Sequence, residues 1–188
     1  MKKKTVNHGC GFLLINKKSK HTFYKKFDRV YIFSNSLHTI STKIKLPDDR
    51  MFNGIDDIEN VVNELKQNDF KTLIILDDVI SDIKSNDFFK SLIYNRRHIG
   101  GGISIILMTQ VYNKLQLDLR KAASHLVMFN STNKKELISI FEDFVNTKKE
   151  TFLDVCNYVF DKKHNFLFLD VNNKLFYKNF NLLSIIEN

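Results

Sequence analysis

Two adjacent carboxylates, Asp77 and Asp78, stand directly after an apolar run within the stretch Thr72 to Val79. Carboxylate oxygens are hard ligands of the kind that Mg²⁺ prefers, and a second acid beside such an ion can orient a water molecule. Acids at this position also cap turns or helices in proteins that have no such site. The pair therefore indicates either a hydrated metal site or a turn.

The elements around the pair favour a site at a sheet edge. The run from Thr72 is β-branched and leucine-rich without polar alternation, which predicts a strand buried on both faces. The carboxyl ends of such strands are where α/β sheets bind ligands. Helical spacing over 55–65 predicts a helix before the strand. A second helix is expected over 85–98, ended by the glycines at 100–102.

The remaining pattern alternates strands with helices. Such alternation with right-handed crossovers predicts an α/β fold with a mostly parallel central sheet, helices on both faces and a C-terminal hairpin at one edge. Asn133 with Glu136 and Thr147 with Glu150 have the spacing of capping boxes. The expected strands are 29–34, 44–46, 103–108, 125–129, 166–170 and 174–177, and the other expected helices are 115–123, 133–145 and 147–160.

Composition limits the function classes. The chain has 188 residues, 43% hydrophobic and 27% charged, which suits one globular domain over 1–188. A formal net charge of +8 favours polyanionic partners, although a solvated basic surface gives the same count. Cys10 and Cys156 are isolated, which predicts a reducing, intracellular setting without disulfides or zinc. No apolar run has membrane-spanning length, so no membrane partner is expected.

An ordered set of motifs follows from these elements. The strand ending in Asp77-Asp78 precedes a helix ending in Arg96-Arg97-His98, a glycine linker and a strand ending in Thr109-Gln110. This order resembles the poxvirus-type genome-packaging ATPases of large DNA viruses and virophages, within the FtsK/HerA superfamily of P-loop ATPases. Further matching segments are 27–34, 119–121 and 125–129, so the resemblance covers about residues 27–145.

The resemblance implies a role for each matching residue. Asp77 would hold Mg²⁺ through water as the Walker B acid, and Asp78 would polarise the attacking water. Gln110 would be the sensor that contacts the γ-phosphate or the water. Arg97, or less readily Arg96 or Arg120, would act as an arginine finger across a subunit boundary. For Arg96 and Arg97, attraction of positive charge to a helix C-terminus explains the sequence equally well.

The phosphate-binding half of the site departs from the family pattern. A phosphate loop has the form Gly-x-x-x-x-Gly-Lys-Ser/Thr, whose backbone N–H groups and Lys bind the phosphates. Gly9-Cys10-Gly11 looks like a remnant that would bind the nucleotide, but Phe12 and Leu13 stand where Lys and Ser/Thr belong. Either the loop is lost or its form is unfamiliar, and the helix after it, near 12–23, is shortened.

Three functions are consistent with these observations. The first is an ATP-hydrolysing, DNA-translocating motor subunit that packages viral genomic DNA into capsids. It implies Mg²⁺ and ATP, double-stranded DNA, a homo-oligomeric ring and capsid or portal partners, in the host cytoplasm (viral factory) or the virion. The second is a non-catalytic relative that serves as a structural or DNA-binding subunit. The third is an unrelated α/β domain. On the first reading, 1–26 is a degenerate segment, 27–145 the ATPase core and 146–188 a C-terminal helix and hairpin.

Overall fold

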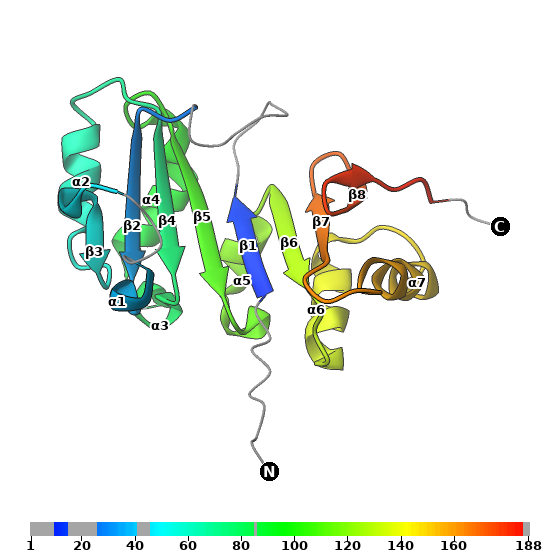
Figure 1. Ribbon diagram of the computed structural model, residues 1–188. Coiled ribbons are helices and arrows are strands. Elements are labelled where there is room, and N and C mark those ends of the chain that lie inside the picture. The colour runs from blue at the N-terminus through cyan, green and yellow to red at the C-terminus, as the bar shows by residue number, and fades with distance from the viewer. Residues whose placement is uncertain (1–9, 15–25, 41–45, 85, 186–188) are drawn as a thin grey trace, which may run out of the picture.

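The computed structural model describes residues 10–14, 26–40, 46–84 and 86–185, and within them one sheet runs through the whole molecule (Figure 1). Its strands lie in the order β3-β2-β4-β5-β1-β6-β7-β8-β9. The strands are β1 (Cys10–Leu14), β2 (Arg29–Ser34), β3 (Met51–Asn53), β4 (Thr72–Asp77), β5 (Ile103–Thr109), β6 (His125–Phe129), β7 (Phe166–Asp170), β8 (Leu175–Lys178) and β9 (Asn181–Leu182).

The predicted parallel core of the α/β fold comprises β3, β2, β4 and β5. In β4, Leu73 on one face of the sheet and Ile74 and Leu76 on the other are all buried, as the unbroken apolar run predicts. Pairing starts with Arg29 opposite Thr72 and with Thr72 opposite Ile103. The three central strands therefore end at one edge of the sheet.

The first strand, β1, differs from the prediction for this segment, which was a phosphate-loop remnant followed by a helix. β1 lies between β5 and β6 and is antiparallel to both, as the opposed arrows in Figure 1 show. Residues 12–14 are thus strand, where the family pattern suggested the beginning of a helix. Pairing with β5 supplies hydrogen-bond partners to an edge that would otherwise be bare.

The rest of the sheet is antiparallel, so the parallel part is smaller than the sequence suggested. The predicted C-terminal hairpin is present as β7 and β8, and β9 adds a further strand that the sequence did not reveal. The predicted strand at 44–46 falls mostly outside the described residues; the short strand of that region is β3, at 51–53.

Seven α-helices connect the described strands. They are α1 (Leu37–Ile40), α2 (Ile58–Leu65), α3 (Ile80–Lys84), α4 (Asp87–Asn95), α5 (Leu117–Lys121), α6 (Lys134–Phe144) and α7 (Lys149–Val159). From α2 to α7, the buried apolar side chains join one core with the sheet face that carries Tyr31, Ile74 and Leu107. Val30 and Leu73, which project from the opposite face, lie outside this core. In the described part, the helices α2 to α7 thus contribute to the core on this face of the sheet.

Capping explains where the helices begin. The Asn86 side chain accepts from the Phe89 N–H at 3.0 Å, and the Asn133 side chain accepts from the Lys135 N–H at 3.1 Å. The capping box predicted at Thr147 is wrong, because its hydroxyl donates to the Lys148 carbonyl and α7 begins one residue later. Among the described residues, no helix is long and apolar enough to cross a membrane.

The glycine run at 100–102 turns the chain from α4 into β5, as predicted. Gly100 has φ +53, a left-handed conformation that glycine adopts at little cost. A Cβ on Gly101 would lie 2.3 Å from the Asp69 carbonyl oxygen, so the turn packs directly on the backbone that leads into β4. The turn therefore fixes the start of β5 beside β4.

We expect Gly101→Ala to lower the free energy of unfolding by about 3 kcal/mol or more, because backbone cannot yield to the added methyl. Gly102→Ala is the control. Its φ of +97 is strained, but its Cβ would meet nothing closer than 3.9 Å, so the expected cost is about 1–2 kcal/mol. Urea unfolding of both variants measures the difference, and equal losses would contradict the close packing.

Candidate functional site at the carboxyl edge

The acid predicted to hold a metal is fixed by a buried serine. Ser34 pairs with Asp77, which pairs with Met108, so the ends of β2, β4 and β5 lie at one level. The Ser34 hydroxyl is fully buried and donates to Asp77 Oδ2 at 2.8 Å, while it accepts from the Ser36 N–H at 3.0 Å. This arrangement orients one carboxylate oxygen of Asp77 and leaves Oδ1 for another ligand.

The second acid has an unusual backbone conformation. Asp78 has φ +54, a left-handed conformation that Asp tolerates better than most residues, and its side chain is exposed. The Asn35 side-chain amide donates to the Asp78 carbonyl oxygen at 3.2 Å and to Asp82 Oδ2 at 3.0 Å. Asn35 thus ties the end of β2 to the turn after β4 and holds Asp78 toward solvent.

Gln110 follows the end of β5 at the same edge and is exposed. The residues on either side of it are constrained. The Thr109 hydroxyl and the Val111 backbone form a local turn, with the Val111 N–H donating at 3.1 Å. The Tyr112 N–H donates to Glu136 Oε1 at 3.1 Å. The sheet therefore brings Asp77, Asp78 and Gln110 to one edge, as the sequence predicted.

Two carboxylates of α6 clamp the segment after Gln110. Glu136 is buried and also accepts from the Ser131 hydroxyl at 3.1 Å. Asp143 accepts from the Tyr112 hydroxyl, and it forms an ion pair with Arg120 at 2.6 Å. Burial, followed by the bond to Asp143, raises the pKa of Tyr112, so the phenol stays protonated. The sequence showed Glu136 only as a capping residue, because its partners are distant in the chain.

The three candidate arginines have different environments. Arg120 is committed to Asp143 and lies over the Tyr112 ring at 5.1 Å. Arg96 is 8% exposed and donates to the Ile93 carbonyl. Burial lowers its pKa, and the Arg97 charge lowers it further. Arg97 is exposed. Both alternatives to Arg97 therefore have structural partners.

Arg97 lies at the opposite edge of the sheet from Asp77 and Asp78 of its own chain. It belongs to a 3₁₀ turn at Arg96–His98 that leads into the amino end of β5. Since β4 rises about 3.3 Å per residue, roughly 17 Å of strand separates this edge from Asp77. The structure therefore leaves Arg97 as a candidate only for action on a neighbouring subunit, which stays a prediction.

The predicted nucleotide-binding segment is a strand where it is described. Cys10 pairs with Thr109 and Gly11 with Met108, while Gly9 lies outside the described residues. At the other end of β1, Leu14 pairs with Ile105 near the amino end of β5. A phosphate loop follows the carboxyl end of its strand, and this end of β1 faces away from Asp77 and Gln110. Met108 pairs with both Gly11 and Asp77, so the amino end of β1 lies at the edge that carries Asp77 and Gln110. Phosphate binding by Gly9-Cys10-Gly11 stays a prediction.

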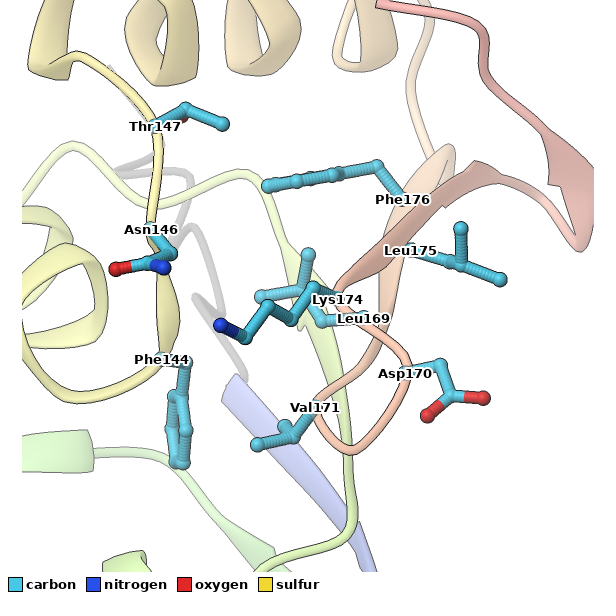
Figure 2. A pocket seen from close by; sticks show the side chains of 9 residues that line it. All are labelled: Phe144, Asn146, Thr147, Leu169, Asp170, Val171, Lys174, Leu175 and Phe176. Atoms are coloured by element: carbon cyan, nitrogen blue, oxygen red, sulfur yellow. The ribbon is translucent and has the colours of Figure 1, made fainter.

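A pocket of about 120 Å³ lies elsewhere, between the end of α6 and the hairpin of β7 and β8 (Figure 2). Its lining is Phe144, Asn146, Thr147, Leu169, Asp170, Val171, Lys174, Leu175 and Phe176. The lining is mainly apolar, and Lys174 extends between the two elements. None of the predicted site residues lines it. In the described part of the chain, no group of three or more His, Cys, Asp or Glu side chains is placed to hold a metal ion.

We expect Arg120→Met to lower the free energy of unfolding by about 2 kcal/mol, because Asp143 would lose its cation in a site that is 14–18% exposed. The exposed Arg97→Met is the matched control, with an expected change within about 0.5 kcal/mol. Chemical denaturation measures both. A similar loss in the two variants would refute the structural role assigned to Arg120.

Comparison with solved structures finds the same fold in viral packaging proteins. The genome packaging NTPase B204 from Sulfolobus turreted icosahedral virus 2, in complex with sulfate, is 18% identical with a TM-score of 0.61; the alignment covers 86% of this chain and 85% of that one. The same protein in complex with ATP-gammaS is 20% identical at a TM-score of 0.56, with 85% and 84% coverage.

The DNA-packaging ATPase B204 from Sulfolobus Turreted Icosahedral Virus is 19% identical at a TM-score of 0.59, with 87% of this chain and 85% of that chain covered. Comparison with curated proteins gives no match. The family model for the Poxvirus A32 protein matches residues 11–184, which is nearly the whole chain. The matched range includes the strand ends with Asp77, Asp78 and Gln110, and the chain therefore belongs to the Poxvirus A32 protein family.

Proposed function

We infer that this chain acts in the packaging of viral genomic DNA as a subunit of a DNA-translocating motor of the ATPase type. The observation that carries the proposal is the meeting of Asp77, Asp78 and Gln110 at one carboxyl edge in a chain of the Poxvirus A32 protein family. Its fold is also that of proteins described as a genome packaging NTPase and a DNA-packaging ATPase. The net charge of +8 supports a polyanionic cargo.

Within this proposal, each residue keeps the role that its position allows. Asp77 has an oxygen oriented by Ser34 and suits a hydrated Mg²⁺, which would neutralise phosphate charge. Asp78, exposed beside it, would accept a proton from water, and Gln110 would orient that water from the next strand. Arg97 would serve an adjacent subunit in a ring. Capsid or portal components and a site in the host cytoplasm or the virion complete the proposal.

Within the described residues, β1 does not have the form of a phosphate loop. Cys10 and Gly11 pair with β5 and β6 through their backbones. The sequence also contains no Gly-Lys pair to complete a phosphate loop. This observation favours a second candidate function, in which the chain is a non-catalytic packaging subunit that binds DNA or supports the ring. The two candidates differ in one property, the binding and turnover of ATP.

For the motor, we expect Asp78→Asn to lower kcat for ATP by about 100-fold or more, because the proton acceptor is lost. Asn is well tolerated at positive φ, so the variant should fold as the parent does. Asp87→Asn, at an exposed acid of α4 that pairs with Lys90, is the control and should leave turnover unchanged. Steady-state turnover that survives Asp78→Asn would remove this role from Asp78.

For the non-catalytic subunit, we expect titration calorimetry to show no binding of Mg-ATP by the folded chain at micromolar concentrations, while duplex DNA still binds. The reason is that β1 is paired as a strand and the sequence has no Gly-Lys pair. A double variant, Asp77→Ala with Asp78→Ala, is measured beside it. Micromolar binding that this variant loses would refute the non-catalytic candidate and support the motor.

A further inference from the structure

Six rings gather on the sheet face opposite the helices, over β6 to β9. We call them the aromatic face: His125, Phe129, Phe166, Phe168, Tyr177 and Phe180. Strand alternation places them there. Leu126, Leu167 and Phe176 project to the other face and belong to the core with α6 and α7, whereas none of the six rings does.

The rings form one continuous surface. Phe168 is at its centre, with centroids 5.4 Å from His125, 5.3 Å from Tyr177 and 5.4 Å from Phe180. Phe166 extends it, 4.9 Å from Phe180 and 5.9 Å from Phe129. Phe180 is 57% exposed and Phe129 is 39% exposed. Contiguous groups of exposed rings mark interaction surfaces more often than rings that are exposed singly.

The most exposed ring sits in a tight turn between β8 and β9. Asn179 has φ +50 and Phe180 has φ +68, the pattern of a two-residue hairpin turn in which Asn or Gly normally occupies both positions. The Asn179 N–H donates to the Phe166 carbonyl at 3.1 Å, and the Asn179 side chain accepts from the Phe166 N–H at 2.9 Å. These bonds hold the Phe180 ring against Phe166 in a conformation that disfavours a bulky residue.

A basic loop adjoins the turn that carries Phe180, while one carboxylate, Asp170, lies beside His125 with 4.0 Å between its Oδ2 and the ring Nε2. The loop at 161–165 contains Lys162, Lys163 and His164, all exposed. It is joined to the turn by the Asn179 amide, which donates to Asn165 Oδ1 at 2.7 Å. The acid of this loop, Asp161, is paired with Lys178 at 2.9 Å. The hydrogen bond from Lys178 holds the pKa of Asp161 low, so the pair stays neutral overall.

We propose that the aromatic face binds single-stranded nucleic acid, with unpaired bases stacked on Phe180, Phe129 and their neighbours and phosphates against Lys162 and Lys163. Stacking on aromatic rings beside a positive track is how proteins hold single strands without sequence preference. A second copy of this chain would bring the same basic loop against itself, whereas Lys162 and Lys163 attract a polyanion. The proposal does not depend on ATP binding or hydrolysis.

The experiment is fluorescence anisotropy with a labelled 15-nucleotide oligo(dT) and a 15-base-pair duplex, at two or more salt concentrations. Phe180→Asn removes the ring but suits the positive φ of the turn, so it should fold at least as well as the parent. Phe129→Thr removes a second ring within β6. Each variant should weaken the Kd for oligo(dT) about fivefold or more, with less than twofold change for the duplex.

Two further variants make the outcome decisive. Tyr94→Asn removes a ring that is 62% exposed on α4, outside the aromatic face, and should leave the Kd for oligo(dT) unchanged. Lys162→Gln with Lys163→Gln should reduce the slope of log K against log salt by about 1.4, or about 0.7 for each phosphate contact.

Unchanged affinity for oligo(dT) in both ring variants would overturn the proposal. It would also be overturned if sedimentation showed a dimer that Phe180→Asn dissociates, because the face would then join two copies. If the ring variants lose oligo(dT) binding but keep duplex binding and ATP turnover, the loss is specific to the aromatic face. The anisotropy measurement does not depend on the packaging proposal, so it can be interpreted even if that proposal fails.

Discussion

The in-register pairing of β2, β4 and β5 is the constraint on which the site depends. It sets Ser34, Asp77 and Met108 at one level, so that the Ser34 hydroxyl reaches Asp77 and the next residues form the turn held by Asn35. A slip of one residue would reverse which face each side chain of β4 presents. It would place Asp77 on the face that carries Ile74 and Leu76, where a carboxylate would be buried under the helices.

The central elements could be predicted from the sequence because local patterns determine them. An apolar run without alternation specified β4 and β5, helical spacing specified α2, and the glycines specified the turn before β5. The convergence of Asp77 and Gln110 then followed from the geometry of parallel strands. That prediction needed only two strand ends and their direction.

Other features depend on contacts between residues distant in the chain, which no local pattern encodes. The three candidate arginines cannot be distinguished in the sequence. In the structure, Arg96 donates to the Ile93 carbonyl and Arg120 pairs with Asp143, whereas Arg97 is exposed. Ser34 and Asn35 resemble ordinary turn residues until β4 lies beside them. Glu136 has capping-box spacing, but its side chain bonds Tyr112 and Ser131. Burial and partners therefore decide the candidate site, and sequence spacing alone does not.

The reversed β1 separates what the fold needs from what nucleotide chemistry needs. A strand between β5 and β6 joins the two halves of the sheet, and either direction supplies backbone partners to β5. Phosphate binding has a stricter requirement, because only a strand parallel to β5 would deliver the loop after it to the edge of Asp77 and Gln110. β1 meets the first requirement through Cys10–Leu14 and fails the second through its direction. Packing and hydrogen bonding therefore preserve the carboxylate edge of this sheet whichever way β1 runs, and they place no constraint on phosphate binding.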